Sequence, residues 1–317
     1  MLKGIGKSHG KTIIMGEHAV VYGYPAFAIP LLSTPVIVKM KQTNQENSLI
    51  SKYYAGKIEQ IPDSLSGVKF LVNLLDTKLN VDKVNYVINI DSGLPIERGM
   101  GSSAAIACAI TRAFFDFFQD NLTHELLLDY VNQSETVTHG KASGLDAQTV
   151  SSDDPIKFSK TEAPKHFNFN SDGFIIIADS GVKGRTKETV ADVRQMYDND
   201  PQKIGAYFKQ LGDYASQASD YLVKGNLKQL GIVFTLANEA LTKLNLAIPK
   251  TDQLIEAANH AGALGSKITG GGRGGCVISL ARNLTNAQMI QKALIKNGAE
   301  QTWIQPLSIY GEDENFD

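Results

Sequence analysis

The hydrophobic pattern changes its period about a third of the way along the chain, and this change constrains the fold most. Before residue 90, short β-branched or alternating runs bounded by Gly, Pro, Asn and Asp predict strands over 12–15, 36–40 and 84–90. From Ile106 to Phe117 the apolar residues recur at helical spacing, and a second helix is predicted over 123–139, ended by Gly140. Mixed strands and helices of this kind predict an α+β fold.

The second half continues the mixture after a predicted buried strand, Phe174 to Asp179. Helices are predicted over about 201–244, 251–261 and 286–296, and strands over 267–269, 276–280 and around 301–305. A chain of 317 residues has the usual length of about two domains. We place the boundary between Asp179 and Val190, which gives an N-terminal domain of residues 1–180 and a C-terminal domain of residues 181–317.

Composition and charge exclude several classes of function. Basic and acidic residues nearly balance, 31 against 33, and no run of Lys and Arg exceeds two, which argues against a nucleic-acid partner. Cys108 and Cys276 stand apart, without the spacing of a disulfide framework or zinc site, as expected in a reducing compartment. Residues 19–38 carry no charge, but their three prolines favour strand, turn and strand over a membrane span. With no secretory signal at the start, we expect a cytoplasmic protein without a membrane partner.

One glycine-rich segment is suited to binding phosphate. The tail Gly10-Lys11-Thr12 lacks the leading glycine of a P-loop, and the glycines at 270, 272 and 275 lead into a predicted strand, unlike a dinucleotide fingerprint. The segment LPIERGMGSSAA, residues 94–105, places glycines and two serine hydroxyls before an Ala-rich helix, whose first N–H groups would face an anion. The alternative is a turn in which Ser102 is an ordinary helix N-cap.

Three further segments accompany this one. They are Lys11 with GEHAVVYGYPA (residues 16–26), Glu135 to Asp146 with its Ser143-Gly144-x-Asp146 end, and KITGGGRGGC (residues 267–276). In this order the four segments resemble the GHMP kinase superfamily and, within it, mevalonate kinases of the short bacterial type. The resemblance covers residues 11 to 276. It implies a two-lobed fold, with an N-terminal lobe like ribosomal protein S5 domain 2 and a C-terminal ferredoxin-like lobe with extra helices.

The resemblance also implies an activity and its site. The reaction would be ATP-dependent phosphorylation of the C5 hydroxyl of mevalonate, with Asp146 and Lys11 as catalytic residues and Mg²⁺ held by Ser103 and Glu135. The nucleotide contacts would be Pro95, Arg98, Gly99, Met100, Gly101, Ser102, Ser103 and Ala104. The substrate contacts would be Glu17, His18, Gly144, Arg185 and Gly271. Such an enzyme has the small molecules mevalonate and ATP as partners. The apolar helices of the second half could face a partner subunit in a homodimer as easily as a core.

Ordinary structural roles compete with these assignments. Ser143-x-x-Asp146 fits a capping box, Glu135 fits an exposed helical position, and the basic loop with Lys183 and Arg185 fits a solvated turn. Arg273, which interrupts a glycine run, could contact a phosphate or point into solvent. At the level of function the alternatives are another GHMP kinase, such as phosphomevalonate kinase or galactokinase, a related decarboxylase, or a ligand-binding regulator without turnover.

Overall fold

The computed structural model describes residues 1–140 and 144–311, and these form two compact units. The first unit comprises residues 1–11, 34–96 and 101–153, and the second comprises 12–33, 97–100 and the chain from 154 onward. Neither unit is one continuous segment, because strands β1 (Lys3–Met15) and β2 (Ala26–Gln42) contribute residues to both. The chain is mixed α+β, as the sequence predicts.

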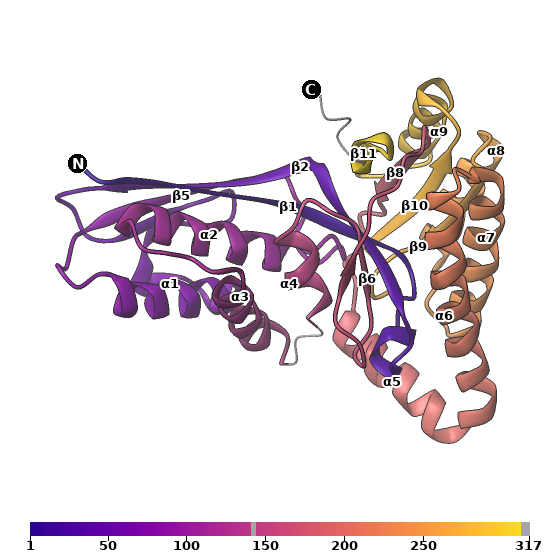
Figure 1. Cartoon of the computed structure of the whole chain (residues 1–317), viewed down its shortest axis with the longest axis horizontal. Coiled ribbons are helices and arrows are strands. Elements are labelled where there is room, and N and C mark those ends of the chain that lie inside the picture. Colours follow the sequence, from indigo (N-terminus) through magenta and orange to yellow (C-terminus); the bar gives the residue numbers. More distant parts are fainter. Residues whose placement is uncertain (141–143, 312–317) are drawn as a thin grey trace. The chain divides into compact units, whose positions relative to one another are not determined.

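The first unit packs helices on one face of a sheet (Figure 1). Residues Val36–Gln42 of β2 pair antiparallel with β5 (Tyr86–Ser92), and β5 pairs parallel with β3 (Ser48–Ile50). Strand β3 pairs antiparallel with β4 (Ala55–Lys57), and β1 pairs with β2. The helices are α1 (Ser66–Leu79), α2 (Ser102–Phe118), α3 (His124–His139) and α4 (Leu145–Val150).

Close packing of β1 on α2 fixes the position of the α2 N-terminus. A Cβ atom at Gly6 would lie 1.9 Å from the carbonyl oxygen of Ala109, so only glycine allows this approach. The facing turns of α2 carry buried alanines, including Ala105 and Ala109, that leave room for the strand backbone. The Ala-rich stretch after the glycine loop therefore brings the helix start near the strand that carries Lys11.

The second unit is built around the antiparallel sheet β11-β8-β10-β9. Its strands are β8 (Phe174–Asp179), β9 (Gly265–Ile268), β10 (Cys276–Ala281) and β11 (Gln301–Pro306). Ala26–Ala28 of β2 pair with β6 (Ile156–Phe158), which pairs with β7 (Lys165–His166). The helices are α5 (Thr186–Asn199), α6 (Pro201–Val223), α7 (Leu227–Lys243), α8 (Pro249–His260) and α9 (Leu284–Lys296).

Most predicted elements are found, and the structure adds others. Helices α1 and α5 fall where the sequence analysis names no element. The segment 19–38, predicted as strand, turn and strand, is a 3₁₀ helix (Ala19–Tyr22) followed by one long strand, β2. Pro30 and Pro35 are tolerated there because they lie between the residues of β2 that pair with β6 and those that pair with β5.

The compact units also differ from a cut between residues 180 and 181. Strand β8 lies before that cut, but it belongs to the second unit because it pairs with both β10 and β11. A family domain boundary at 180/181 stays a prediction. Within residues 1–140 and 144–311, no helix combines the length and the apolar character that a membrane crossing requires.

Candidate active site

The α2 N-terminus is an uncapped helix start in the first unit. Its N-cap is Gly101, in the left-handed conformation with φ of 69°, and no side chain caps it. Ser102 is therefore the first helical residue and not the N-cap, which corrects the alternative reading of this serine. The N–H groups of Ser102, Ser103 and Ala104 have no intrahelical partner, and the Ser102 hydroxyl is buried without a hydrogen-bond partner among the described residues. This is an anion-binding arrangement.

Lys11 of β1 and Asp146 of α4 form an ion pair in the same unit. Lys11 Nζ lies 2.8 Å from Asp146 Oδ1; the lysine side chain is 3% exposed and the aspartate side chain 33% exposed. Lys11 also packs against the glycine loop, because a Cβ atom at Gly101 would lie 2.7 Å from Lys11 Cγ. A buried ammonium group is thereby fixed against a carboxylate that solvent reaches.

The helix cap of α4 differs from the predicted capping box. The N-cap is Gly144, with φ of 84°, so Asp146 is the second helical residue and not the third. A capping box needs its acidic residue at the third position, and Ser143, its other member, lies outside the described residues. Asp146 is still in the first turn of α4, where the positive end of the helix dipole interacts favourably with a carboxylate.

Glu135 of α3 is buried, which is contrary to the exposed helical position considered from sequence. It is 6% exposed and accepts a hydrogen bond from Ser103, while its Oε1 atom has no partner among the described residues. Burial raises the pKa of Glu135, and the nearby Asp146 carboxylate raises it further, against the lowering effect of Ser103. His139, four residues later, is exposed and lies 3.8 Å from Glu135 in the last turn of α3.

The oxygen atoms of these side chains are suitable ligands for a hard divalent cation. Ser103 and Glu135 supply oxygen atoms, and Asp146 adds negative charge close by. An orphaned, buried carboxylate oxygen beside a second carboxylate is a site where a cation would relieve both the desolvation and the repulsion. No group of three or more His, Cys, Asp and Glu side chains in the described part of the chain forms a complete ligand set, so water or ligand oxygens would fill the remaining positions.

His18 and Glu17 are held in the second unit by the segment after α8. The His18 Nε2 atom lies 3.0 Å from the Gly271 carbonyl oxygen, and burial lowers the pKa of His18. A carbonyl only accepts, so Nε2 carries the proton and Nδ1 of the neutral ring is an acceptor. Glu17 forms a fully buried ion pair with Lys267 of β9, whose pKa is lowered by burial. Sequence reasoning gave Lys267 no role.

Two threonines strengthen the same junction. The Thr269 hydroxyl donates to the Ile13 carbonyl oxygen at 2.8 Å and lies 3.2 Å from the Thr12 hydroxyl. Because Thr269 has one hydroxyl proton, Thr12 donates to Thr269. The segment 267–271 thus contacts the end of β1 through Thr269, Glu17 through Lys267, and His18 through Gly271.

The arginines named from sequence are engaged elsewhere in the second unit. Arg98 binds Asp179 through Nε, at 2.8 Å from Oδ1, and its Nη1 atom is buried without a partner among the described residues. Arg185 is the exposed N-cap of α5 and lies 3.6 Å from Glu188. Arg273 pairs with Asp192 and donates to the Asn245 carbonyl oxygen.

The remaining predicted residues lie around the loop that precedes α2. Pro95 and Gly99 are half-buried, Met100 and Ala104 are buried, and Gly99 adopts a positive φ of 79°. Residues 97–100 belong to the second unit, and residues 101–153 belong to the first. Lys183 pairs with Glu97 at 2.9 Å in an exposed contact.

Known proteins match nearly the whole length of the chain. The chain matches the family GHMP kinases N terminal domain over residues 67–152 and the family GHMP kinases C terminal over residues 218–300. Mevalonate kinase of Pyrococcus furiosus is 30% identical over 306 residues, which span 89% of this chain and 90% of that protein.

Solved structures of mevalonate kinases also match nearly the whole chain. Mevalonate kinase from methicillin-resistant Staphylococcus aureus has a TM-score of 0.77 at 31% identity and covers 97% of this chain and 100% of its own. The L. major mevalonate kinase, solved in complex with R-mevalonate, has a TM-score of 0.81 at 26% identity, with 96% of each chain covered. Ser103, Glu135 and Asp146 fall in the first matched family range and Lys267 and Gly271 in the second, whereas Lys11, Glu17 and His18 precede both.

Proposed function

Because this chain belongs to the mevalonate kinase family of the GHMP kinases, we propose that it transfers the γ-phosphoryl group of ATP to the C5 hydroxyl of mevalonate. The product is 5-phosphomevalonate, a precursor in isoprenoid synthesis. The observation that carries this proposal within the structure is the Lys11–Asp146 pair in the same unit as the uncapped α2 N-terminus. The pair supplies a fixed cation and a carboxylate acceptor, and the helix start supplies phosphate-binding N–H groups.

In the proposed reaction Asp146 receives or orients the proton of the acceptor hydroxyl. Its Oδ1 atom is held by Lys11, so Oδ2 is the atom available to that hydroxyl. Lys11 offsets negative charge on the transferring phosphoryl oxygens. The Ser102, Ser103 and Ala104 N–H groups bind ATP phosphates at the α2 start, with Gly99 and Gly101 allowing the close approach.

We propose that Ser103 and Glu135 hold Mg²⁺. The orphaned Glu135 oxygen fits this ion, which prefers carboxylate oxygen and keeps several other oxygen ligands. When bound, Mg²⁺ would neutralise phosphate charge. Without it, the chain's own Lys11 and helix N–H groups remain the positive groups at that position.

Four of the five proposed acceptor contacts, all but Gly144, belong to the second unit. Glu17 and His18 sit at the turn before the Ala19–Tyr22 helix, and Gly271 orients His18 through its carbonyl oxygen. Gly144 and Arg185 complete the proposed set, with the exposed Arg185 guanidinium suited to a carboxylate. That the protein is cytoplasmic, and that it forms a homodimer, stay predictions.

An acceptor panel tests the function. Purified protein with ATP and Mg²⁺ is offered mevalonate, phosphomevalonate, galactose or homoserine, and ADP release and the phosphorylated position are measured. We expect mevalonate to stimulate ADP release far more than the others, with phosphate on C5. Equal activity with phosphomevalonate, or phosphate on C3, contradicts the assigned reaction. No turnover with any acceptor favours the regulator instead.

A further inference from the structure

The elements that carry Lys11 and Asp146 are joined at a second place, away from that ion pair. Arg112 of α2 donates from Nη1 to the Lys7 carbonyl of β1 at 2.6 Å and from Nη2 to the Ser151 carbonyl at 2.8 Å. Lys7 lies four residues before Lys11 on the same strand, and Ser151 directly follows α4, five residues after Asp146. One guanidinium therefore bridges both elements.

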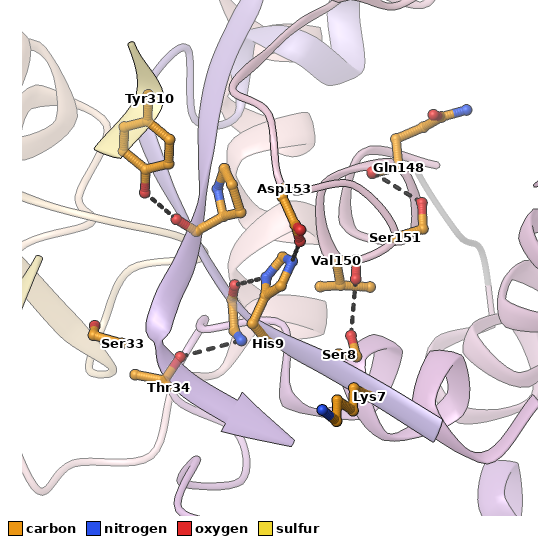
Figure 2. A network of polar contacts seen from close by, with 12 residues as sticks. Lys7, Ser8, His9, Ser33, Thr34, Gln148, Val150, Ser151, Asp153 and Tyr310 are labelled. Atoms are coloured by element: carbon orange, nitrogen blue, oxygen red, sulfur yellow. Dashed lines mark hydrogen bonds and ion pairs between the residues drawn. The ribbon is translucent and has the colours of Figure 1, made fainter. Parts of the chain in front are cut away.

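The neighbouring strand residue adds a parallel bond. The Ser8 hydroxyl donates to the Val150 carbonyl, the last residue of α4, at 2.8 Å. Figure 2 shows Ser8 directed at Val150, and His9 directed at Asp153 just beyond the helix, where the ring nitrogen and carboxylate oxygen are 3.3 Å apart. The three consecutive β1 residues Lys7, Ser8 and His9 thus all contact the end of α4 directly or through Arg112.

These contacts matter because α4 is short. It has six residues, and the carbonyls of its last turn have no partner inside the helix. Arg112 and Ser8 satisfy two acceptors at this end, of which one receives a charged donor. A helix held only at Lys11–Asp146 could rotate about that contact, whereas attachment at both ends fixes its orientation as well as its position.

We propose that Arg112 is a positioning residue that, with Ser8, holds α4 against β1 so that the Asp146 carboxylate stays in place for phosphoryl transfer. The effect on turnover that this inference predicts rests on the proposed function. Arg112 acts through Asp146 and touches neither substrate nor nucleotide in this assignment. A displacement near 1 Å in a catalytic group typically lowers turnover about 100-fold, so a modest release of α4 has a measurable effect.

The test begins with Arg112→Met, which keeps much of the apolar stem and removes both donors. We expect kcat to fall about 10- to 100-fold, while KM for ATP and mevalonate changes less than about threefold. Arg112→Lys, which cannot span two carbonyls as a planar fork does, should lose less, on the order of threefold. Ser8→Ala, a small change that removes one bond, should also lower kcat modestly. The matched control is Arg194→Met, an exposed helical arginine on α5, which should leave kcat unchanged.

A double-mutant cycle separates positioning from a general structural role. In an Asp146→Asn background, adding Arg112→Met should change kcat less than about twofold, because the group it positions is already altered. The same factor of loss in both backgrounds overturns the inference. A wild-type kcat in Arg112→Met also overturns the inference. If Arg112→Met does not fold, a wild-type kcat in both Ser8→Ala and Arg112→Lys overturns it.

A second readout does not depend on the acceptor. The shift in melting temperature caused by Asp146→Asn should shrink when Arg112→Met is present, since the two sites are coupled through α4. Additive shifts in melting temperature overturn the inference even if the kinetic assay fails. Absence of mevalonate-dependent turnover in the wild type instead counts against the proposed function, while the melting cycle still decides the role of Arg112.

Discussion

Asp146 and Glu135 are neighbouring carboxylates in different surroundings. Asp146 is one-third exposed and pairs with the buried Lys11 side chain, so solvent reaches this carboxylate. Glu135 is buried, with one oxygen unpartnered among the described residues and its pKa raised by burial. We therefore expect replacement of the two residues to have different kinetic and thermodynamic signatures.

Asp146→Asn should lower turnover by about 10² to 10⁴, with the KM for ATP little changed, because Asn can neither accept the hydroxyl proton nor pair with Lys11 as an anion. Steady-state kinetics and a melting curve on the same preparation provide the measurement. Asp129→Asn, an exposed position on α3, is the control. Near-normal turnover with a lowered melting temperature would return Asp146 to a purely structural role at the start of α4.

Glu135→Gln should raise the Mg²⁺ concentration needed for activity and sharply lower turnover, since the amide lacks the charge that the ion prefers. Mg²⁺ titrations of turnover and of melting temperature measure this. Glu125→Gln, exposed in the first turn of the same helix, serves as the control. An unchanged Mg²⁺ dependence would remove Glu135 from the metal site.

The raised pKa of Glu135 also gives a pH prediction for the metal-free protein. Its contribution to stability is full below the ordinary pKa of 4.5 and is lost as pH rises through the higher folded-state pKa, because the buried carboxyl then ionises. Glu135→Gln should abolish this component, so the metal-free variant should be at least as stable as wild type at neutral pH. Denaturant titrations across pH 4 to 8 measure it, and a variant with the wild-type pH dependence would contradict the cause assigned here.

At the scale of elements, the buried Lys267–Glu17 pair joins β9 to the turn that carries His18. Lys267→Met leaves the Glu17 charge buried without this cation, and such single losses cost about 3–5 kcal/mol of unfolding free energy. The double variant Lys267→Met with Glu17→Gln should recover much of that stability. Lys209→Met, which breaks an exposed pair on α6, should have little effect. Equal small effects from Lys267→Met and Lys209→Met would refute the importance of the buried pair.

Elements were predictable from sequence where their own pattern was sufficient. Strand β8 matches its prediction at both ends, and α3 follows the Thr123 cap and Gly140 stop. Helix α1 did carry a local signal, because its buried residues Leu71, Val72 and Leu75 recur at helical spacing. The interpretation of the first ninety residues as strand-rich passed over that signal.

The local sequence pattern does not predict helix α5 or the side-chain contacts that support the site. Helix α5 buries few side chains, Thr189 and Val193, and is anchored by the Asp192–Arg273 pair. The four family segments located the residues proposed for the site. The contacts that support them were not predicted: Lys267 begins the fourth segment, but its partner Glu17 lies 250 positions away and the local pattern does not indicate the pairing.

At the scale of the whole molecule, the place of β8 in its sheet predicts how fragments behave. A fragment of residues 181–317 lacks β8, which pairs with both β10 and β11, so β11 loses its strand partner in the sheet and β10 becomes an edge strand. We expect no cooperative unfolding from this fragment by circular dichroism. A fragment of residues 154–317 retains all four strands and should resist proteolysis better. A cooperative transition for 181–317 would contradict the dependence on β8.

Gly101 and Lys11 are ninety positions apart in the sequence, yet their close contact makes the residue at one position depend on the residue at the other. Any side chain at 101 would have to occupy the space of the Lys11 stem, whose far end is anchored to Asp146, and would also force a left-handed backbone. Substitution of Gly101 is therefore expected to require a compensating change at Lys11, which links variation in the loop before α2 to variation in strand β1.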